Sequence, residues 1–223
     1  MSAKRILVMG YGGYFSGERN YLRNLAFEAM EKATIPLRNA GLYDFRCIEL
    51  SGDGTFQEVY SLIHQEMENH RPEIVLIAGT RLSADAIYLE ERAHNRYVER
   101  YSSFVVPQNS ENKLLEEGAS SYRTLLPLCR ICCKLREDES LSVEIRHSTD
   151  AGGHGCNAAL YAALHISNQL NHKAGITFVH IPFTREQADL IFEKTKETKP
   201  FVDSDVQIQA ISRIIEVCAE VDF

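Results

Sequence analysis

A glycine-rich turn with the sequence STDAGGHGCN, residues 148–157, decides the fold that we predict for this chain. The preceding residues 141–146 (LSVEIR) alternate apolar and polar side chains, which is typical of a half-buried strand. The following residues 158–165 (AALYAALH) are rich in Ala and Leu and predict a helix. Three glycines in four positions permit a tight turn and a close approach of the backbone. Cys156 therefore falls at the junction of a strand, a turn and a helix.

The predicted position of Cys156, on or near the first turn of a helix, favours a reactive thiol. Backbone N–H groups without a helical partner and the positive end of the helix dipole are found at such a position. Both stabilise a thiolate. The alternative interpretation is a small buried cysteine beside a glycine-rich loop. The choice between a reactive thiol and a buried structural cysteine depends on the other residues of the chain.

Length and composition narrow the class of protein. The 223 residues are enough for one sizeable core, and we predict a single domain over residues 1–223. A net charge of −7 disfavours a nucleic-acid binder. No apolar run approaches the length of a transmembrane helix, and no signal peptide is evident. Six cysteines without a secretory signal indicate free thiols in a reducing compartment, so we expect a cytoplasmic protein without a membrane partner.

Apolar runs alternate with amphipathic segments in the first third of the chain. Residues 5–10, 45–50 and 73–79 predict strands, and residues 20–33 and 55–69 predict helices between them. This alternation is typical of βαβ units in a mostly parallel sheet. Ligands bind beyond the carboxyl ends of the strands in such sheets. We therefore expect the site at that edge.

The second half of the chain adds a strand at residues 176–183 and a last helix at residues 203–221. Residues 122–135 predict a further helix that carries Cys129, Cys132 and Cys133. We interpret these cysteines as small core residues, because no complementary Cys or His pair stands at metal-ligand spacing. Neither they nor the glycine loop after residue 10 predicts a metal or a dinucleotide cofactor.

Cys156, His180 and Glu90 are each predicted to follow or end a strand at the same edge of the sheet. A thiol nucleophile needs a base within hydrogen-bond reach, and the base needs a third group that orients it. A cysteine and a histidine alone are weak evidence, and a structural histidine in His180's position is the alternative.

Five motifs stand in the chain in a defined order and spacing. Residues 148–157 match S-x-x-A-G-x-x-x-C-[ND], residues 178–182 match F-[IV]-H-[IV]-P, and residues 87–95 match I-x-x-E-x-x-x-x-N. Residues 8–20 look like V-T-G-F…N, and residues 118–127 match G-x-x-x-Y-x-x-x-L-P. Together these motifs resemble those of the pyroglutamyl peptidase I family of cysteine peptidases, and the resemblance extends over nearly the whole chain.

The resemblance implies a three-layer α/β/α sandwich around a mostly parallel twisted sheet. It implies an enzyme without a cofactor or metal that removes an N-terminal pyroglutamyl residue from small peptides through a thioester. By carry-over, Cys156 is the nucleophile, His180 the general base and then acid, and Glu90 the orienting carboxylate. The residues expected to bind the substrate are Tyr11, Tyr14, Asn20, Thr80 and His154.

The sequence departs from the family around the substrate. Tyr11 and Tyr14 stand where the family has Phe, and His154 stands where an aromatic residue is common. Gly155 replaces an apolar residue before the nucleophile, so we expect a more polar pocket. Another amide or lactam substrate, and a non-catalytic binding protein on the same scaffold, therefore remain alternatives. The sequence also leaves open a homo-oligomer.

Two charged residues near the predicted site carry further expectations. Ala84 stands where the family has Arg, and Arg81 is a candidate to take its place beside an oxyanion or a substrate carboxylate. A solvated surface arginine is the alternative. Glu91, next to Glu90, is expected to be a solvated surface charge. We also expect Cys156 to be the one reactive thiol of the six.

Overall fold

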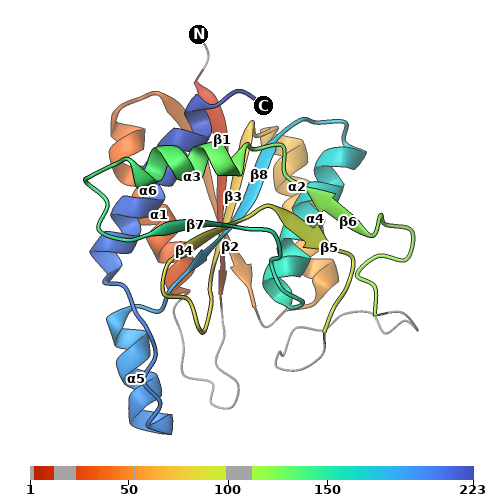
Figure 1. Cartoon of the computed structure of the whole chain (residues 1–223). Helices are drawn as coiled ribbons and strands as arrows, with labels where there is room; N and C mark the ends of the chain where they lie inside the picture. The colour runs from red at the N-terminus through yellow and green to blue at the C-terminus, as the bar shows by residue number, and fades with distance from the viewer. Residues whose placement is uncertain (1–2, 13–23, 53, 99–111) are drawn as a thin grey trace.

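The computed structural model describes residues 3–12, 24–52, 54–98 and 112–223 (Figure 1). Within these ranges, one six-stranded sheet has the order β2-β1-β3-β8-β4-β7. Its strands are β1 (Lys4–Gly12), β2 (Tyr43–Ser51), β3 (Ile74–Thr80), β4 (Ile87–Glu90), β7 (Ile145–Ser148) and β8 (Gly175–Ile181). The sheet lies between two layers of helices, so the predicted sandwich around a mostly parallel sheet is confirmed.

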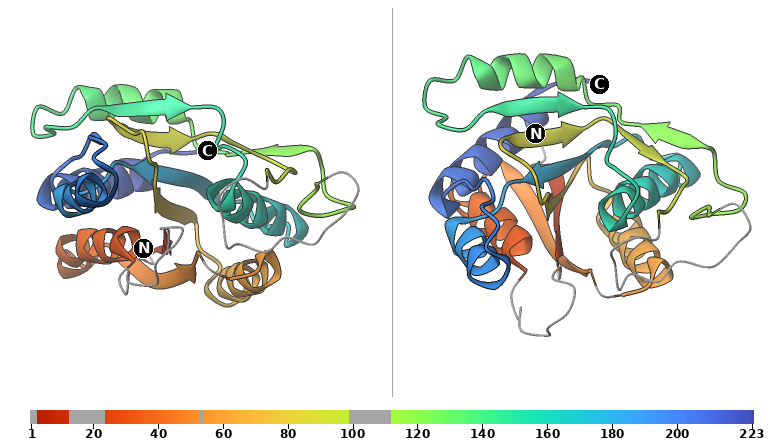
Figure 2. Two further views of the ribbon diagram at one scale, coloured as in Figure 1. Left: turned by 90° about the horizontal axis from the view of Figure 1, so that it is seen from below. Right: turned by 60° about the horizontal axis from the view of Figure 1, so that its bottom comes forward.

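The helices divide between the two faces of the sheet (Figures 1 and 2). One layer contains α1 (Leu25–Asn39), α3 (Leu128–Arg136) and α6 (Ser204–Glu220). The other layer contains α2 (Phe56–His70) and α4 (Gly155–Gln169). Two further elements complete the fold: α5 (Arg185–Thr195) projects from the body, and β5 (Arg92–His94) pairs with β6 (Ser121–Arg123) beside α4.

Strand pleating divides the core into two parts, because successive side chains point to opposite faces. In β8, Val179 packs with the residues of α1, α3 and α6, and Phe178 packs with those of α2 and α4. In β4, Leu89 faces the same layer as Val179. His180 and Glu90 are each one residue along from these, so both face the layer that contains α4. The pleat thus sets the side of the sheet on which the site forms.

The strands next to the site do not all run as predicted. β4 pairs antiparallel with β8 and parallel with β7, so β4 and β7 run opposite to the rest of the sheet. The physical reason is the short connection between β3 and β4, residues 81–86, since a parallel crossover needs about a dozen residues or more. The strand predicted at residues 141–146 begins later in the structure, as β7 (Ile145–Ser148).

Side-chain caps mark the start of two helices. Thr55 caps α2 and Thr184 caps α5, each in a capping box with the residue three positions on. The helix predicted at residues 122–135 was wrong at its start, because β6 occupies part of it and α3 begins after Pro127.

This shift also changes the interpretation of the three neighbouring cysteines. The buried stripe of α3 is Leu128, Ile131, Cys132 and Leu135. Cys132 is a core residue as expected, but Cys129 and Cys133 lie off the stripe and are exposed, so the core assignment was wrong for these two. No group of three or more His, Cys, Asp or Glu side chains in the described ranges could hold a metal ion.

Candidate active site

Cys156 lies in the first turn of α4, as the sequence predicted. His154 is the N-cap residue in an extended conformation, and its carbonyl accepts the first helical hydrogen bond from Ala158 N at 3.0 Å. Gly152 turns the chain with a φ of 89°, in the left-handed region that favours glycine. The first N–H groups of α4 have no partner within the helix. A partly buried thiol thus sits beside donors that suit a thiolate or an oxyanion.

His180 and Glu90 form a buried pair. His180 Nδ1 and Glu90 Oε1 are 2.7 Å apart, and their side chains are 7% and 0% exposed. The Glu90 backbone is held as well, because Thr177 Oγ1 donates a hydrogen bond to the Glu90 carbonyl at 2.9 Å. The bond at Nδ1 leaves Nε2 of the imidazole for Cys156.

The electrostatics of His180 tie it to both neighbours. Burial lowers the pKa of His180, since a charged imidazole is disfavoured away from water. The charge of Cys156, its hydrogen bond to the imidazole and the contact with Glu90 outweigh burial and raise the pKa to about 9. The three side chains from β4, α4 and β8 therefore act on one another as a cysteine–histidine–glutamate set.

Other carboxylates near the sheet edge have partners of their own. Asp85 accepts hydrogen bonds from Tyr88 Oη at 2.8 Å and Arg146 Nη1 at 2.9 Å. Asp150 is paired with Arg96 at 3.0 Å. Neither is the partner of His180, so Glu90 is the carboxylate that the structure brings to the histidine.

Arg81 and Thr80 lie directly beside this set. Arg81 Nη1 is 3.7 Å from Glu90 Oε1, the oxygen that also contacts His180. The guanidinium lies over the Tyr88 ring at 4.8 Å, and the side chain is 42% exposed. Thr80 ends β3 opposite Ile181 of β8. The arginine is thus partly solvated, but it faces the site.

Tyr11 and Gly155 are fitted to each other. A Cβ atom on Gly155 would lie 1.8 Å from Tyr11 Oη, so no larger residue fits there while the Tyr11 side chain keeps its place. Tyr11 is 8% exposed. Two departures from the family pattern, Tyr11 in place of Phe and Gly155 in place of an apolar residue, therefore contact each other directly before Cys156.

The remaining predicted substrate residues are not assembled by the described structure. The His154 side chain is exposed, and its ring meets that of Tyr97 edge-on at 6.4 Å between centroids. Tyr14 and Asn20 fall outside the described residues.

The environment of Glu91 differs from the one expected from the sequence. Glu91 is 8% exposed, and its two carboxylate oxygens contact Arg123 and His147. It is therefore a buried, paired carboxylate and not a solvated charge. The alternation of the pleat explains this, because the residue after Glu90 points to the opposite face, beneath α3.

Two asparagines that the motifs contain hold the backbone around the site. Asn157 is fully buried and bonds to the N–H and carbonyl of His94 and to the carbonyl of Arg96, at 2.8–3.0 Å. Asn95 bonds in the same manner to Leu115 and Gly118. The sequence analysis assigned no role to these two asparagines. The only indication of a role was that both are part of the family motifs.

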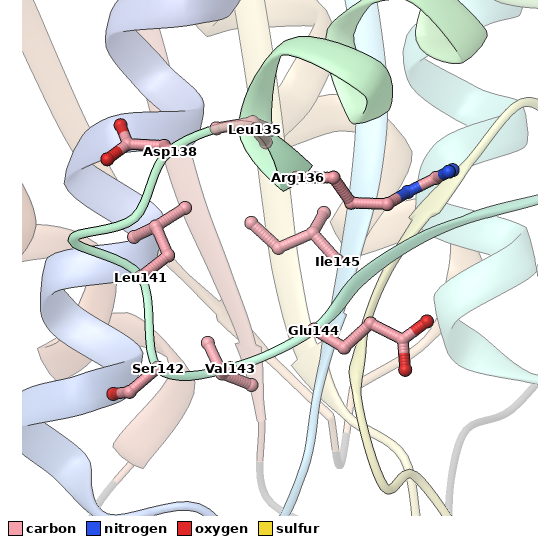
Figure 3. A pocket seen from close by; sticks show the side chains of 8 residues that line it. All are labelled: Leu135, Arg136, Asp138, Leu141, Ser142, Val143, Glu144 and Ile145. Atoms are coloured by element: carbon pink, nitrogen blue, oxygen red, sulfur yellow. The ribbon is translucent and has the colours of Figure 1, made fainter.

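A shallow pocket of about 330 Å³ lies elsewhere, between the end of α3 and the start of β7 (Figure 3). Its lining includes Leu135, Asp138 and Ile145 and none of the predicted site residues. It is not a candidate for the active site. Across the described part of the chain, no helix combines the length and apolar character that a bilayer crossing requires.

The fold and the site together define a class of protein. A cysteine at a helix N-terminus, facing a buried histidine that a carboxylate holds, is the arrangement of a thiol hydrolase. The chain belongs to the pyroglutamyl peptidase family, whose sequence model matches residues 5–221.

Relatives and solved structures agree with this assignment. The pyrrolidone-carboxylate peptidase of Enterococcus faecalis is 29% identical over 183 residues, which are 82% of this chain and 80% of the relative. That of Brachyspira hyodysenteriae is 28% identical over 78% of this chain and 82% of its own. The pyrrolidone carboxyl peptidases of Pyrococcus furiosus and Thermococcus litoralis share the fold. Their TM-scores are 0.78 and 0.77, at 23% and 20% identity, over 97% of this chain and 98% and 94% of theirs.

Proposed function

We propose that this chain is a cysteine peptidase that removes an N-terminal pyroglutamyl residue from peptides. The observation that carries the proposal is the buried contact of His180 with Glu90 at 2.7 Å, beside Cys156 at the start of α4, in a chain of this family. The same scaffold without catalysis would have no need of a histidine whose pKa is raised by a neighbouring thiolate.

The reaction follows from the three side chains. Cys156, as a thiolate, attacks the carbonyl of the pyroglutamyl residue, and His180 gives its proton to the leaving amine. Water activated by His180 then hydrolyses the thioester. Glu90 holds the imidazole through Nδ1 and stabilises its charged form. We assign stabilisation of the oxyanion to the first N–H groups of α4, which have no partner within the helix.

Arg81 is proposed as a positioning residue that acts through Glu90. Its guanidinium is 3.7 Å from Glu90 Oε1, close enough to fix the carboxylate. The sequence expectation that Arg81 meets an oxyanion or a substrate carboxylate stays a prediction. Thr80 and Tyr11, at the ends of their strands, are the described candidates for lining the pyroglutamyl pocket.

We further propose that residues 1–223 act as one cytoplasmic domain that needs no cofactor. One sheet carries both parts of the hydrophobic core, which supports the single domain. The six free cysteines support a reducing compartment.

The test is hydrolysis of a pyroglutamyl-aminocoumarin substrate by the whole chain, before and after treatment with iodoacetamide. We expect turnover that alkylation of Cys156 abolishes. An alanyl-aminocoumarin substrate is the control for a general aminopeptidase. Turnover that survives full alkylation of Cys156, or no turnover on the pyroglutamyl substrate, would overturn the proposal.

A further inference from the structure

A second cysteine–histidine–glutamate cluster lies on the opposite face of the sheet from Cys156. Cys129 Sγ of α3 is 3.4 Å from His147 Nδ1 of β7. The other ring nitrogen of His147 contacts Glu91 Oε2, and Glu91 Oε1 contacts Arg123. The side chains of His147 and Glu91 are 20% and 10% exposed, whereas Cys129 is open to solvent.

The fold places this cluster for the same reason that it places the first. Ile145 of β7 packs into the layer that contains α3, and His147, two residues on, points the same way. Glu91 follows Glu90 and therefore points away from α4. The Glu91 N–H donates to the Ser148 carbonyl at 2.8 Å, which keeps the two segments side by side.

In place of the expectation that Cys156 is the one reactive thiol, we propose that Cys129 is a modification site: a second activated thiol that reacts with peroxides and takes no part in peptide hydrolysis. His147 accepts the thiol proton, and the imidazolium that forms is held by Glu91. A thiolate, and not a thiol, is the nucleophile in such reactions. An exposed thiolate with a fixed imidazole partner is the environment in which oxidation is site-selective.

The reaction with hydrogen peroxide needs no other reactant. The Cys129 thiolate attacks one peroxide oxygen, so that an S–O bond forms and the O–O bond breaks. The leaving hydroxide takes the proton from the His147 imidazolium and becomes water. The sulfur is oxidised by two electrons to a sulfenic acid, and the peroxide is reduced by the same two electrons.

The neighbouring cysteines provide internal controls. Cys133, four residues on in α3, is also exposed, but in the described ranges no imidazole contacts it. Cys132 between them is buried, and burial raises its pKa to about 11. The three thiols thus share one helix and differ in their surroundings. A faster reaction of Cys129 than of Cys133 isolates the effect of His147.

The experiment treats the whole protein with hydrogen peroxide at neutral pH, traps sulfenic acids with dimedone and maps the peptides. Trypsin separates residues 124–130, which contain Cys129, from residues 131–134, which contain the other two. We expect Cys129 to react about tenfold faster than Cys133. His147→Gln should reduce the rate of Cys129 to that of Cys133 and leave Cys133 unchanged.

Equal rates for the two exposed thiols in the wild-type protein would overturn the proposal, whether or not the His147 variant folds. An unchanged Cys129 rate in a folded His147→Gln protein would overturn it too. Cys129→Ser should leave hydrolysis of the pyroglutamyl substrate intact. A loss of hydrolysis in Cys129→Ser would contradict the separation of the two clusters without bearing on the role of Cys156.

Discussion

Glu90 and Glu91 are neighbours in the chain, yet they serve two different cysteine–histidine clusters on opposite faces of one sheet. Glu90 holds His180 beside Cys156, where both the acid and the base are almost fully buried. Glu91 contacts His147 beside Cys129, which is exposed. The residue types are the same. The main difference is the exposure of the thiol, because Cys156 is partly buried and Cys129 is open to solvent.

The exposure of each cluster to solvent determines which reaction it can support. Charges interact far more strongly in a site of low effective dielectric than at the surface. At the buried cluster this interaction overcomes desolvation and keeps His180 charged. The cluster also lies at the start of α4, with its free N–H groups. At the second cluster, Cys129 also lies in the first turn of a helix, α3, but its thiol is exposed, so solvent screens the contact between the sulfur and His147. We therefore assign hydrolysis to the first and simple thiol reactivity to the second.

The largest expected effect comes from removing each sulfur in turn. Cys156→Ser should lower kcat on a pyroglutamyl substrate by at least about 10⁴-fold, because the nucleophile is lost. Cys129→Ser should stay within about twofold of wild type. Steady-state kinetics on the two variants measures both. Comparable losses in both would mean that the clusters are not independent.

The two adjacent carboxylates give a closer comparison. Glu90→Gln should lower kcat by about a hundredfold or more, because the amide no longer stabilises the His180 imidazolium. Glu91→Gln should change kcat by no more than about threefold, since its side chain faces away from Cys156. Both variants keep the size of the side chain. Wild-type turnover in Glu90→Gln would remove its proposed role.

A smaller effect is expected from a single methyl group. Gly155→Ala places a Cβ against Tyr11 and should destabilise the protein by about 1–3 kcal/mol through overpacking. Gly54→Ala is a control with a smaller expected loss, because its Cβ would meet only the capping carboxylate of Glu58 within 3.4 Å, at 3.0 Å. Thermal unfolding measures the difference. The oxidation rate of Cys129 should not change in either variant.

Much of this arrangement could be predicted from the sequence. The turn at residues 148–157 predicted the place of Cys156, and apolar runs predicted the layered fold. The family motifs brought His180 and Glu90 into the same site. The first two signals are local patterns in the sequence, whereas the third needs the resemblance of two separate motifs to a known family.

The second cluster could not be predicted, because it depends on contacts between distant segments. Cys129 and His147 are 18 residues apart and meet only because α3 packs over β7. The exposure of Cys129 could have been predicted from helical spacing, because the apolar stripe of α3 does not include it. It was missed because all three cysteines were assigned to the core as a group, without separating the faces of the helix. The reversed direction of β4 and β7 was missed because strand patterns carry no direction.

The pH dependence of the fold follows from the raised pKa of His180. The native state binds this proton more tightly than the unfolded chain does. The stabilising contribution is therefore complete below about pH 6.5, the ordinary pKa of histidine, and is lost as the pH rises toward 9. Denaturant titrations across this range should show a decrease in stability that is smaller in Cys156→Ser.

NMR titration of the His180 imidazole, in wild type and in Cys156→Ser, measures the coupling of His180 to its two neighbours. We expect a pKa of about 9 in the wild-type protein, because the thiolate and Glu90 both favour the imidazolium. A lower pKa is expected in the variant, where the charge of the sulfur is gone. A His180 that titrates near its ordinary value in wild type, or at the same pH in both proteins, would contradict a coupled Cys156–His180–Glu90 site.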